Sequence, residues 1–385
     1  MNLKRILIVA SVASMIDQFN MPNIRLLKEL GYEVHVACNF EKGSTCTAER
    51  IERLKEALQA LDVRYFQVDF SRKVTRLLRD RTPYRQLMRI VTENEYTLMH
   101  CHSPIGGVIG RLVARKAGIP VIYTAHGFHF YRGAPLKNWV LFYPVEKYCA
   151  RLTDLLITIN REDFALAQRK LRAKRIAYIP GVGIDTDRFA AADTDRRRMR
   201  AELEIPADAR VLLSVGELNA NKNHETVIRA LATLEGADDL YYVLVGKGEL
   251  DRYLRGLAAS AGLGDRVKLT GFRTDVRALY GMADFFVFPS FREGLSVSLM
   301  EAMASGLPAA VSRIRGNTDL IDGKGGVLFD PHSVPDCAAA LKRLLSGTPE
   351  TYRAMQVYNM QKVRAFGTDC VDREMRMLYQ SMENE

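Results

Sequence analysis

Residues 285–311 read FFVFPSFREGLSVSLMEAMASGLPAAV. The apolar run 285–288 has the length of a buried strand, and after a polar loop a largely apolar helix is predicted from about Ser296. Gly306 follows this helix, as glycine often does at a helix C-terminus, and a second apolar run covers 309–311. Short apolar strands alternating with helices are typical of a parallel sheet covered by helices on both faces.

The same alternation runs through both halves of the 385-residue chain. The other predicted strands are 5–10, 33–38, 98–101, 121–124, 155–159, 210–215, 241–245 and 267–269. We therefore predict an α/β protein with two doubly wound domains, residues 1–185 and 186–366, joined through 179–185, where apolar sequence gives way to charged sequence. Ligands of such sheets bind beyond the carboxyl ends of the strands, so functional residues are expected in the loops there.

Composition narrows the class of protein. Hydrophobic residues make up 48% and charged residues 26%, which are globular proportions, and no apolar run reaches the length of a membrane span.

The six cysteines never approach C-x-x-C spacing and are expected to be reduced and structural. The apolar stretch after Lys4 and Arg5 could be a signal peptide, but Ser11, Ser14 and Asp17 interrupt it. We predict a first buried strand and a cytoplasmic protein.

Positive charge is concentrated in the first half. Residues 1–190 carry 30 Lys and Arg against 18 Asp and Glu, whereas the remainder carries 25 against 27. Seven basic residues fall within 72–89, namely Arg72, Lys73, Arg76, Arg79, Arg81, Arg85 and Arg89. Such a surface suits nucleic acid, an anionic membrane or a phosphorylated lipid, and it is equally compatible with a solvated helix. The charge alone leaves these alternatives open.

The loop and helix that follow strand 285–288 contain a candidate anion site. The backbone N–H groups of Gly294, Leu295 and Ser296 lie near the helix N-terminus, where unpaired N–H groups attract phosphate. Glu301 lies further along the helix in apolar sequence, where a carboxylate needs hydrogen-bond donors such as ribose hydroxyls. A capping role for Glu293 and a structural partner for Glu301 explain the same residues equally well.

This segment resembles the E-x7-E signature of family 4 retaining glycosyltransferases, with Glu293 and Glu301 at its acidic positions. Further matches to the family pattern occur in order along the chain, at 31–34, 124–127, 180–185 and 245–248. Within the family, segments 11–23 and 124–130 resemble bacterial transferases that assemble capsular or exopolysaccharide repeat units on an undecaprenyl-diphosphate carrier.

The resemblance implies the GT-B fold, with two Rossmann-like domains that face each other across a cleft. Residues 1–185 would form the acceptor-side domain, residues 186–366 would bind the nucleotide sugar, and a last helix, 367–382, would pack back on the first domain. Neither a metal nor a cofactor is expected. Two D-x-D patterns, at 185–187 and 193–195, lie in the linker, where turn and capping roles are more probable than metal binding.

The resemblance also assigns roles to single residues. Glu301 would bind the ribose and Glu293 would hold hydroxyls of the donor sugar. Lys222 would hold the diphosphate together with the N–H groups of 294–296, and Gly246 would belong to the same donor site. His126, which follows a strand and precedes a glycine, would face the donor sugar from the first domain. By its position alone, the role of a core histidine is favoured, and the resemblance to the family reverses this preference.

One departure from the family pattern affects the diphosphate site. The family usually has Gly-Arg-Leu after the first strand of the second domain, whereas this chain has Glu217 in place of the arginine. A carboxylate about 4 Å from a phosphate is unfavourable by roughly 4 kcal/mol at an effective dielectric constant of 20. We therefore expect Glu217 to turn away or to be neutralised. The candidate cations are Lys222, Lys247, Arg292, Arg313 and Arg315.

Two other groups of residues are ambiguous in the sequence. His35, His100 and His102 are expected to be structural. The aromatic cluster Phe128, His129, Phe130 and Tyr131 could contact an acceptor lipid or could pack in the interior.

Together these features predict a retaining glycosyltransferase at the inner face of the cytoplasmic membrane. It would move a sugar from a nucleotide diphosphate, expected to be UDP, to a hydroxyl of a polyprenyl-diphosphate-linked glycan, bind anionic membrane and not bind nucleic acid. One alternative is a nucleotide-sugar epimerase on the same fold. The other is a non-catalytic protein that binds membrane or nucleic acid through its basic half.

Overall fold

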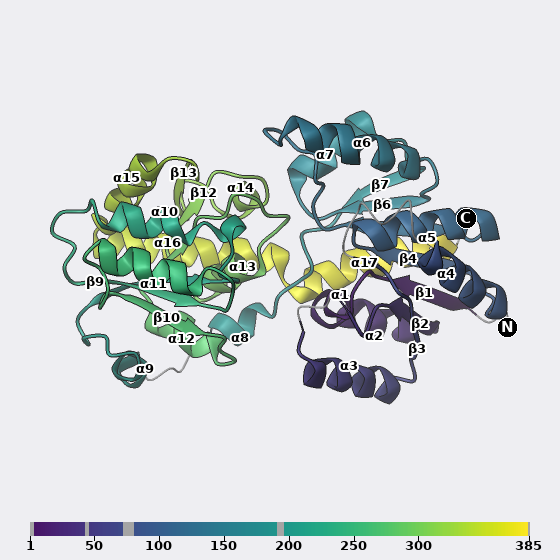
Figure 1. The fold of residues 1–385 in the computed structure, drawn as a ribbon, viewed down its shortest axis with the longest axis horizontal. Coiled ribbons are helices and arrows are strands. Elements are labelled where there is room, and N and C mark those ends of the chain that lie inside the picture. Colours follow the sequence, from purple (N-terminus) through teal and green to yellow (C-terminus); the bar gives the residue numbers. More distant parts are fainter. Residues whose placement is uncertain (1–3, 43–45, 72–80, 191–195, 384–385) are drawn as a thin grey trace. The chain divides into compact units, whose positions relative to one another are not determined.

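The computed structural model describes residues 4–42, 46–71, 81–190 and 196–383, and it divides the chain into two compact units. Unit 1 comprises Met1–Val182 together with Val371–Glu385, and unit 2 comprises Gly183–Cys370. In Figure 1 each unit is a sheet flanked by helices. The boundary expected after residue 185 lies three residues beyond the observed one.

Unit 1 is built on a seven-stranded parallel sheet with the order β3-β2-β1-β4-β5-β6-β7. Its strands are β1 (Arg5–Val9), β2 (Glu33–Cys38), β3 (Arg64–Gln67), β4 (Leu98–His102), β5 (Val121–Ala125), β6 (Leu155–Thr158) and β7 (Arg175–Tyr178). Its helices are α1 (Ala13–Phe19), α2 (Met21–Glu29), α3 (Ala48–Ala60), α4 (Thr82–Glu93), α5 (Pro104–Ala117), α6 (Leu136–Ala150), α7 (Arg161–Lys170) and most of α17 (Thr368–Glu383). The ambiguous N-terminal stretch is thus a buried central strand, as predicted.

Unit 2 has a six-stranded parallel sheet with the order β10-β9-β8-β11-β12-β13. Its strands are β8 (Arg210–Val215), β9 (Leu240–Val245), β10 (Val267–Gly271), β11 (Phe285–Phe288), β12 (Ala309–Ser312) and β13 (Gly326–Phe329). Its helices are α8 (Thr186–Ala190), α9 (Arg196–Glu202), η2 (Ala220–Lys222), α10 (His224–Leu231), α11 (Asp251–Ser260), α12 (Val276–Met282), α13 (Val297–Ala304), α14 (Asn317–Leu320), α15 (Val334–Leu345), α16 (Pro349–Val363) and η3 (Arg364–Phe366). The predicted class, two doubly wound α/β domains, is confirmed.

Both sheets reverse their strand order at the first strand of the unit. β1 lies between β2 and β4, and β8 lies between β9 and β11. At such a reversal the connections leave toward opposite faces of the sheet, which opens a crevice at the carboxyl ends of the two central strands. The loops that follow β8 and β11 in unit 2, and β1 and β4 in unit 1, therefore mark where a ligand can reach each sheet.

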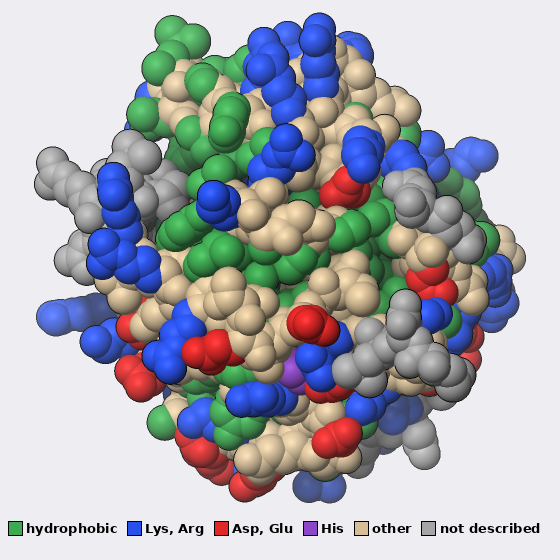
Figure 2. Space-filling model, turned by 90° about the vertical axis from the view of Figure 1, so that its right-hand side faces the viewer, with side chains coloured by type: hydrophobic (Ala, Val, Ile, Leu, Met, Phe, Trp, Pro, Cys, Tyr) green, Lys and Arg blue, Asp and Glu red, His purple; other side chains and the backbone are tan. Residues whose placement is uncertain are grey.

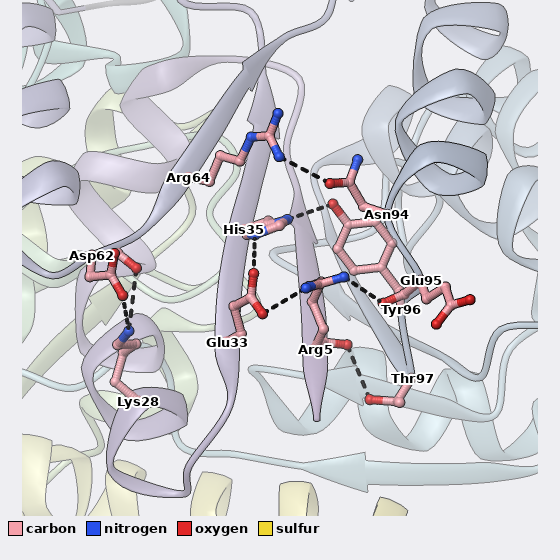
Figure 3. Close-up of polar contacts among 10 residues, drawn as sticks. All are labelled: Arg5, Lys28, Glu33, His35, Asp62, Arg64, Asn94, Glu95, Tyr96 and Thr97. Atoms are coloured by element: carbon pink, nitrogen blue, oxygen red, sulfur yellow. Dashed lines mark hydrogen bonds and ion pairs between the residues drawn. The ribbon is translucent and has the colours of Figure 1, made fainter. Parts of the chain in front are cut away.

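A polar network joins residues near the amino ends of the strands in unit 1 (Figure 3). Arg5 at the start of β1 donates to Glu33 at the start of β2 over 2.8 Å, and His35 contacts Glu33 through Nε2 at 2.9 Å and the Tyr96 hydroxyl through Nδ1 at 2.8 Å. Arg5 lowers the pKa of Glu33, whereas burial lowers the pKa of His35. His35 is therefore structural, as predicted.

Glycines bring α5 close to the first sheet. A Cβ on Gly107 would lie 2.4 Å from the Tyr123 ring, and one on Gly110 would lie 2.3 Å from Cys101 Sγ. These glycines serve helix-sheet packing. In the described ranges, no helix has the length and apolar content that a bilayer span requires.

Candidate functional site

The candidate site in unit 2 lies at the reversal of strand order, in the loops after β8 and β11. Lys222 ends the short helix η2 after β8, and Glu293 lies in the loop after β11. The Lys222 Nζ and Glu293 Oε1 atoms are 2.8 Å apart, and Nζ lies 4.6 Å from the centroid of the Phe288 ring. The structure therefore brings together two of the predicted catalytic residues, and both side chains are largely buried, with 18% and 15% of their surface exposed.

Two asparagines hold these loops in place. Asn221 donates from its side chain to the Arg292 carbonyl over 2.9 Å, and its own carbonyl accepts from the Phe291 N–H at 2.8 Å. Asn223, which is buried, donates to the carbonyls of Pro289 and Pro331. These hydrogen bonds join the loop after β8 to the backbone of the loop after β11. The fold of the two loops therefore sets the relative position of Lys222 and Glu293.

The helix after this loop begins at Val297, with Ser296 as its N-cap. The Ser296 hydroxyl accepts from the Leu299 N–H at 3.3 Å. Leu295 and Ser296 are buried, whereas Gly294 is partly exposed. The three residues assigned to the phosphate thus precede the helix rather than form its first turn. Their N–H groups stay candidates for phosphate binding, alongside those of the first turn itself.

Glu301 lies on α13 in a different environment from Glu293. The Tyr280 hydroxyl lies 3.0 Å from Glu301 Oε2 and also 3.0 Å from the Ser298 carbonyl, so it shares one hydrogen between two acceptors. Burial raises the pKa of Glu301 to about 7, although the Tyr280 hydroxyl and the charge of Arg188 act in the opposite direction. The carboxylate therefore has unused acceptor capacity and gains little from its present partner. The sequence analysis did not identify Tyr280.

Gly246, assigned to the donor site, has a structural reason to be glycine. It follows β9 with φ of +153°, and a Cβ there would lie 1.8 Å from the Gly216 carbonyl oxygen. The loop after β9 therefore lies directly against the loop that leads to Lys222.

Glu217 is exposed and has no ion pair with any residue in the described ranges. Lys222, one candidate to neutralise it, pairs with Glu293 instead, and Arg315 donates to the Glu293 carbonyl at 3.1 Å. Among the described residues, none of the candidate cations forms an ion pair with Glu217, and its turning away from the diphosphate stays a prediction.

In unit 1, three histidines cluster at the carboxyl ends of β4 and β5. His102 Nδ1 and His126 Nε2 are 3.2 Å apart, while His100 contacts the Tyr379 hydroxyl and Thr124 Oγ1, each at 2.8 Å. Burial lowers the pKa of His100 to about 3 and also lowers those of His102 and His126, so the cluster is neutral at pH 7. His100 is structural, as predicted.

His102 is buried, as expected of a structural histidine, but one of its ring nitrogens is unpartnered in the described ranges. Its Nε2 is buried with no hydrogen-bond partner in the described part of the chain. With His126 it lines a cavity of about 20 Å³, enough for one water molecule. Phe19, Asn23, Thr124, Gly181 and Met375 also line this cavity. His102 ends β4, and this position at a strand end was the sequence signal that could have placed it at the cavity.

The aromatic cluster after His126 packs inside unit 1. Phe128 and Phe130 are buried, with ring centroids 4.9 Å apart, and Phe130 also contacts Trp139 and Tyr143. These two rings are therefore not available to a lipid surface.

The first D-x-D pattern has a capping role, because Asp185 Oδ1 accepts from the Arg188 N–H at 2.9 Å at the start of α8. The second, at 193–195, lies outside the described residues, as do Arg72, Lys73, Arg76 and Arg79 of the basic run. Within the described ranges, no group of three or more His, Cys, Asp and Glu side chains is arranged to hold a metal ion.

Comparison with known proteins identifies the family of the chain. Residues 24–188 match the model of Glycosyltransferase Family 4, and residues 195–362 match that of Glycosyl transferases group 1. The Bacillus subtilis protein EpsD, named as a glycosyltransferase, is 36% identical over 385 residues, which cover 98% of this chain and 96% of EpsD. The chain belongs to glycosyltransferase family 4. An Escherichia coli relative, UDP-Gal:alpha-D-GlcNAc-diphosphoundecaprenol alpha-1,3-galactosyltransferase, is 28% identical over 86% of this chain and 84% of its own length.

Solved structures show the same fold in other proteins. Anabaena HepE in complex with UDP superposes with a TM-score of 0.78 at 19% identity, over 98% of this chain and 100% of HepE. WaaG, a glycosyltransferase involved in lipopolysaccharide biosynthesis, gives a TM-score of 0.72 at 18% identity over 98% of this chain and 99% of WaaG. This family 4 glycosyltransferase therefore has the GT-B fold, as predicted.

We expect Gly246→Ala to destabilise the enzyme by more than about 2 kcal/mol, because the new Cβ meets a backbone carbonyl and the φ of +153° strains any other residue. Gly256→Ala is the matched control, because its Cβ meets open space in α11 and alanine favours the helix. Urea unfolding of both variants measures the difference. Equal stability of the two would contradict the described contact between the loops.

We expect Glu301→Gln to stabilise the unliganded enzyme at pH 8 but not at pH 4. Because the pKa is raised to about 7, the unfolded carboxylate ionises before the folded one, so the folded state loses stability as pH rises from about 4.5 to 7. The loss is on the order of 3 kcal/mol, and glutamine removes it. Chemical unfolding at both pH values measures it, with the exposed Glu249→Gln as control. A pH-independent difference would disprove the raised pKa.

Proposed function

We propose that this enzyme transfers a sugar, with retention of configuration, from a UDP-sugar to a hydroxyl of a lipid-diphosphate-linked glycan in the synthesis of a cell-surface polysaccharide. The observation that carries the proposal is the pairing of Lys222 with Glu293 at the reversal of strand order in unit 2, with Glu301 on the helix that follows. A cation and two carboxylates in these positions suit a diphosphate, a sugar and a ribose.

The comparisons support the donor and the acceptor classes. The E. coli relative has a UDP-sugar and a diphosphoundecaprenol-linked glycan in its name, and HepE was solved with UDP. The E. coli relative matches most of this chain and most of its own length. HepE supports the fold, and its structure holds UDP.

The chemistry requires positive charge where the diphosphate departs. The acceptor oxygen forms a bond to the anomeric carbon while the bond from that carbon to the diphosphate oxygen breaks, and the acceptor proton passes to the departing diphosphate on the same face of the sugar. Negative charge grows on the diphosphate as the sugar becomes oxocarbenium-like, so a fixed cation lowers the barrier. Lys222 and the N–H groups around the start of α13 would supply this stabilisation, and no metal would be required.

The two carboxylates would have different partners in the donor complex. We assign the ribose to Glu301, because its buried carboxylate lacks sufficient hydrogen-bond donors in the unliganded enzyme and two hydroxyls would supply them. We assign the donor sugar to Glu293, which would give up Lys222 to the diphosphate and accept sugar hydroxyls in its place. We also propose His126 as a catalytic residue, whose neutral imidazole would form a hydrogen bond with the donor sugar.

The acceptor class places the reaction at a membrane. A glycan on a polyprenyl carrier stays at the bilayer surface, so we propose peripheral attachment to the cytoplasmic face, where nucleotide sugars are available. The net charge of +10 favours an anionic surface.

A donor panel tests the proposal. UDP-, GDP- and ADP-sugars are incubated with the enzyme, with and without short-chain lipid-diphosphate sugars and in the presence of a chelator, and nucleotide release is measured. We expect release from a UDP-sugar only with the acceptor, and a product whose anomeric configuration by NMR matches that of the donor. Conversion of the sugar without an acceptor would instead indicate an epimerase, and inversion would refute the proposed stereochemistry.

Four alanine variants test the division of roles. Glu301→Ala and Lys222→Ala should each weaken UDP binding about 10-fold to 100-fold, because a charged hydrogen-bonding group is lost. Glu293→Ala and His126→Ala should leave UDP affinity unchanged or, for Glu293→Ala, slightly higher since Lys222 is released, while kcat falls. Calorimetry with UDP and steady-state kinetics separate the two classes. The assignment fails if all four variants lose UDP affinity and kcat together.

A further inference from the structure

Helix α6 exposes an apolar face. Among the described residues, nine large hydrophobic side chains are exposed, and five of them lie on this one helix. These five are Leu136 (77% exposed), Val140 (65%), Leu141 (62%), Val145 (40%) and Tyr148 (56%). Single exposed hydrophobic residues are ordinary, but a contiguous group marks an interaction site.

The orientation of α6 is set by its buried side. At 100° per residue, the five exposed side chains fall within one half of the helix circumference. The opposite half carries Glu146, which accepts two hydrogen bonds from Arg111 at 2.5 and 3.0 Å, and the guanidinium of Arg111 lies 3.9 Å from the centroid of the Tyr123 ring. This buried ion pair holds the helix on unit 1 with its apolar half outward.

The apolar face is accompanied by positive charge. Lys137 and Lys147 project from the exposed half, near the two ends of α6, and Arg151 follows the helix at its C-cap. The one acidic residue of the helix, Glu146, is buried in its pair with Arg111. Figure 2 shows hydrophobic side chains beside Lys and Arg side chains at the top of the face it presents, whereas Asp and Glu side chains gather mostly lower on it.

We propose that the exposed half of α6 is a membrane-docking surface that inserts its apolar side chains at the interface of a bilayer containing anionic lipid. An apolar stripe with flanking lysines is the composition of helices that lie in this interface. The proposal deepens the proposed function, since the lipid-linked acceptor resides in such a membrane. Docking through α6 combines insertion with electrostatic attraction, so salt should weaken binding without abolishing it.

The charges favour a membrane over a second copy of the chain. A two-fold axis through the middle of the apolar face would pair the same surface with itself. It would bring Lys137 of one copy near Lys147 of the other, and no exposed acidic residue of α6 would compensate for this repulsion. Anionic headgroups complement the same lysines.

The single tryptophan of the chain reports on α6 directly. Trp139 lies on this helix, on the half that packs against Phe130 and Tyr143, and it is partly buried. Its fluorescence therefore reports the approach of a bilayer to α6, although Trp139 is not one of the inserting side chains. The enzyme is mixed with vesicles of phosphatidylcholine, with and without phosphatidylglycerol, in which a fraction of the acyl chains is brominated. We expect quenching of Trp139 by the brominated chains, stronger with phosphatidylglycerol and reduced but still present at high salt.

Variants separate this surface from the remaining exposed hydrophobic residues. Val140→Glu combined with Leu141→Glu should lower vesicle partitioning at least 10-fold, and Lys137→Glu combined with Lys147→Glu should lower it on anionic vesicles. The matched control combines Val357→Glu and Phe272→Glu, which are 49% and 60% exposed in unit 2 and should bind as the wild type does. Thermal unfolding verifies that each variant is folded.

The possible outcomes either support or overturn the proposal. Absence of vesicle binding, an equal loss in the control, or a dimer in sedimentation experiments that disappears in the Val140→Glu, Leu141→Glu variant would overturn it. Transfer to a short-chain acceptor in detergent, measured on the same variants, should be unchanged. Vesicle binding by an enzyme that transfers no sugar would disprove the proposed function and leave the docking surface standing.

Discussion

The ion pair between Lys222 and Glu293 is the interaction on which the candidate donor site depends. Two opposite charges, each largely buried, are costly to desolvate, and they are tolerated here because they lie 2.8 Å apart. Their separation is set by loops after two neighbouring strands, which Asn221 and Asn223 join through backbone carbonyls. The topology of the sheet thus determines the electrostatics of the site. A diphosphate that enters brings negative charge that competes with Glu293 for the same lysine.

The environments of the two carboxylates explain how one short segment could serve two functions. Glu293 lies beside a cation, whereas Glu301 is buried beside a tyrosine hydroxyl that also contacts a backbone carbonyl. Burial raises the pKa of Glu301, because the charged carboxylate is poorly stabilised there. A ligand that donates hydrogen bonds to it would stabilise it. Environment, rather than residue type, distinguishes the roles, as is common where two carboxylates share a site.

The central strands were predictable because they are buried on both faces. β2, β8 and β11 have the predicted bounds, and the other predicted strands differ at their ends by one or two residues. The three strands that the sequence analysis missed, β3, β7 and β13, all lie at sheet edges. β3 and β7 are only partly buried, so their sequences carry no continuous apolar run, and β13 is a four-residue strand that begins with glycine.

The family motif identified the acidic pair, Lys222 and His126, but not their partners. Tyr280, His102 and Asn223 reach the sites through contacts that join distant parts of the sequence, and no local pattern marks them. The face of α6 was missed for a related reason. The apolar residues of α6 are spread around the whole helix, so its sequence shows no single buried stripe, and only the structure shows which half the unit covers.

A crystal structure of the enzyme with UDP would show directly whether Lys222, Glu293 and Glu301 form the donor site. We expect the Lys222 ammonium to leave Glu293 for the diphosphate and the ribose hydroxyls to donate to Glu301. A nucleotide bound elsewhere, or a bound diphosphate with Lys222 still paired to Glu293, would contradict this assignment.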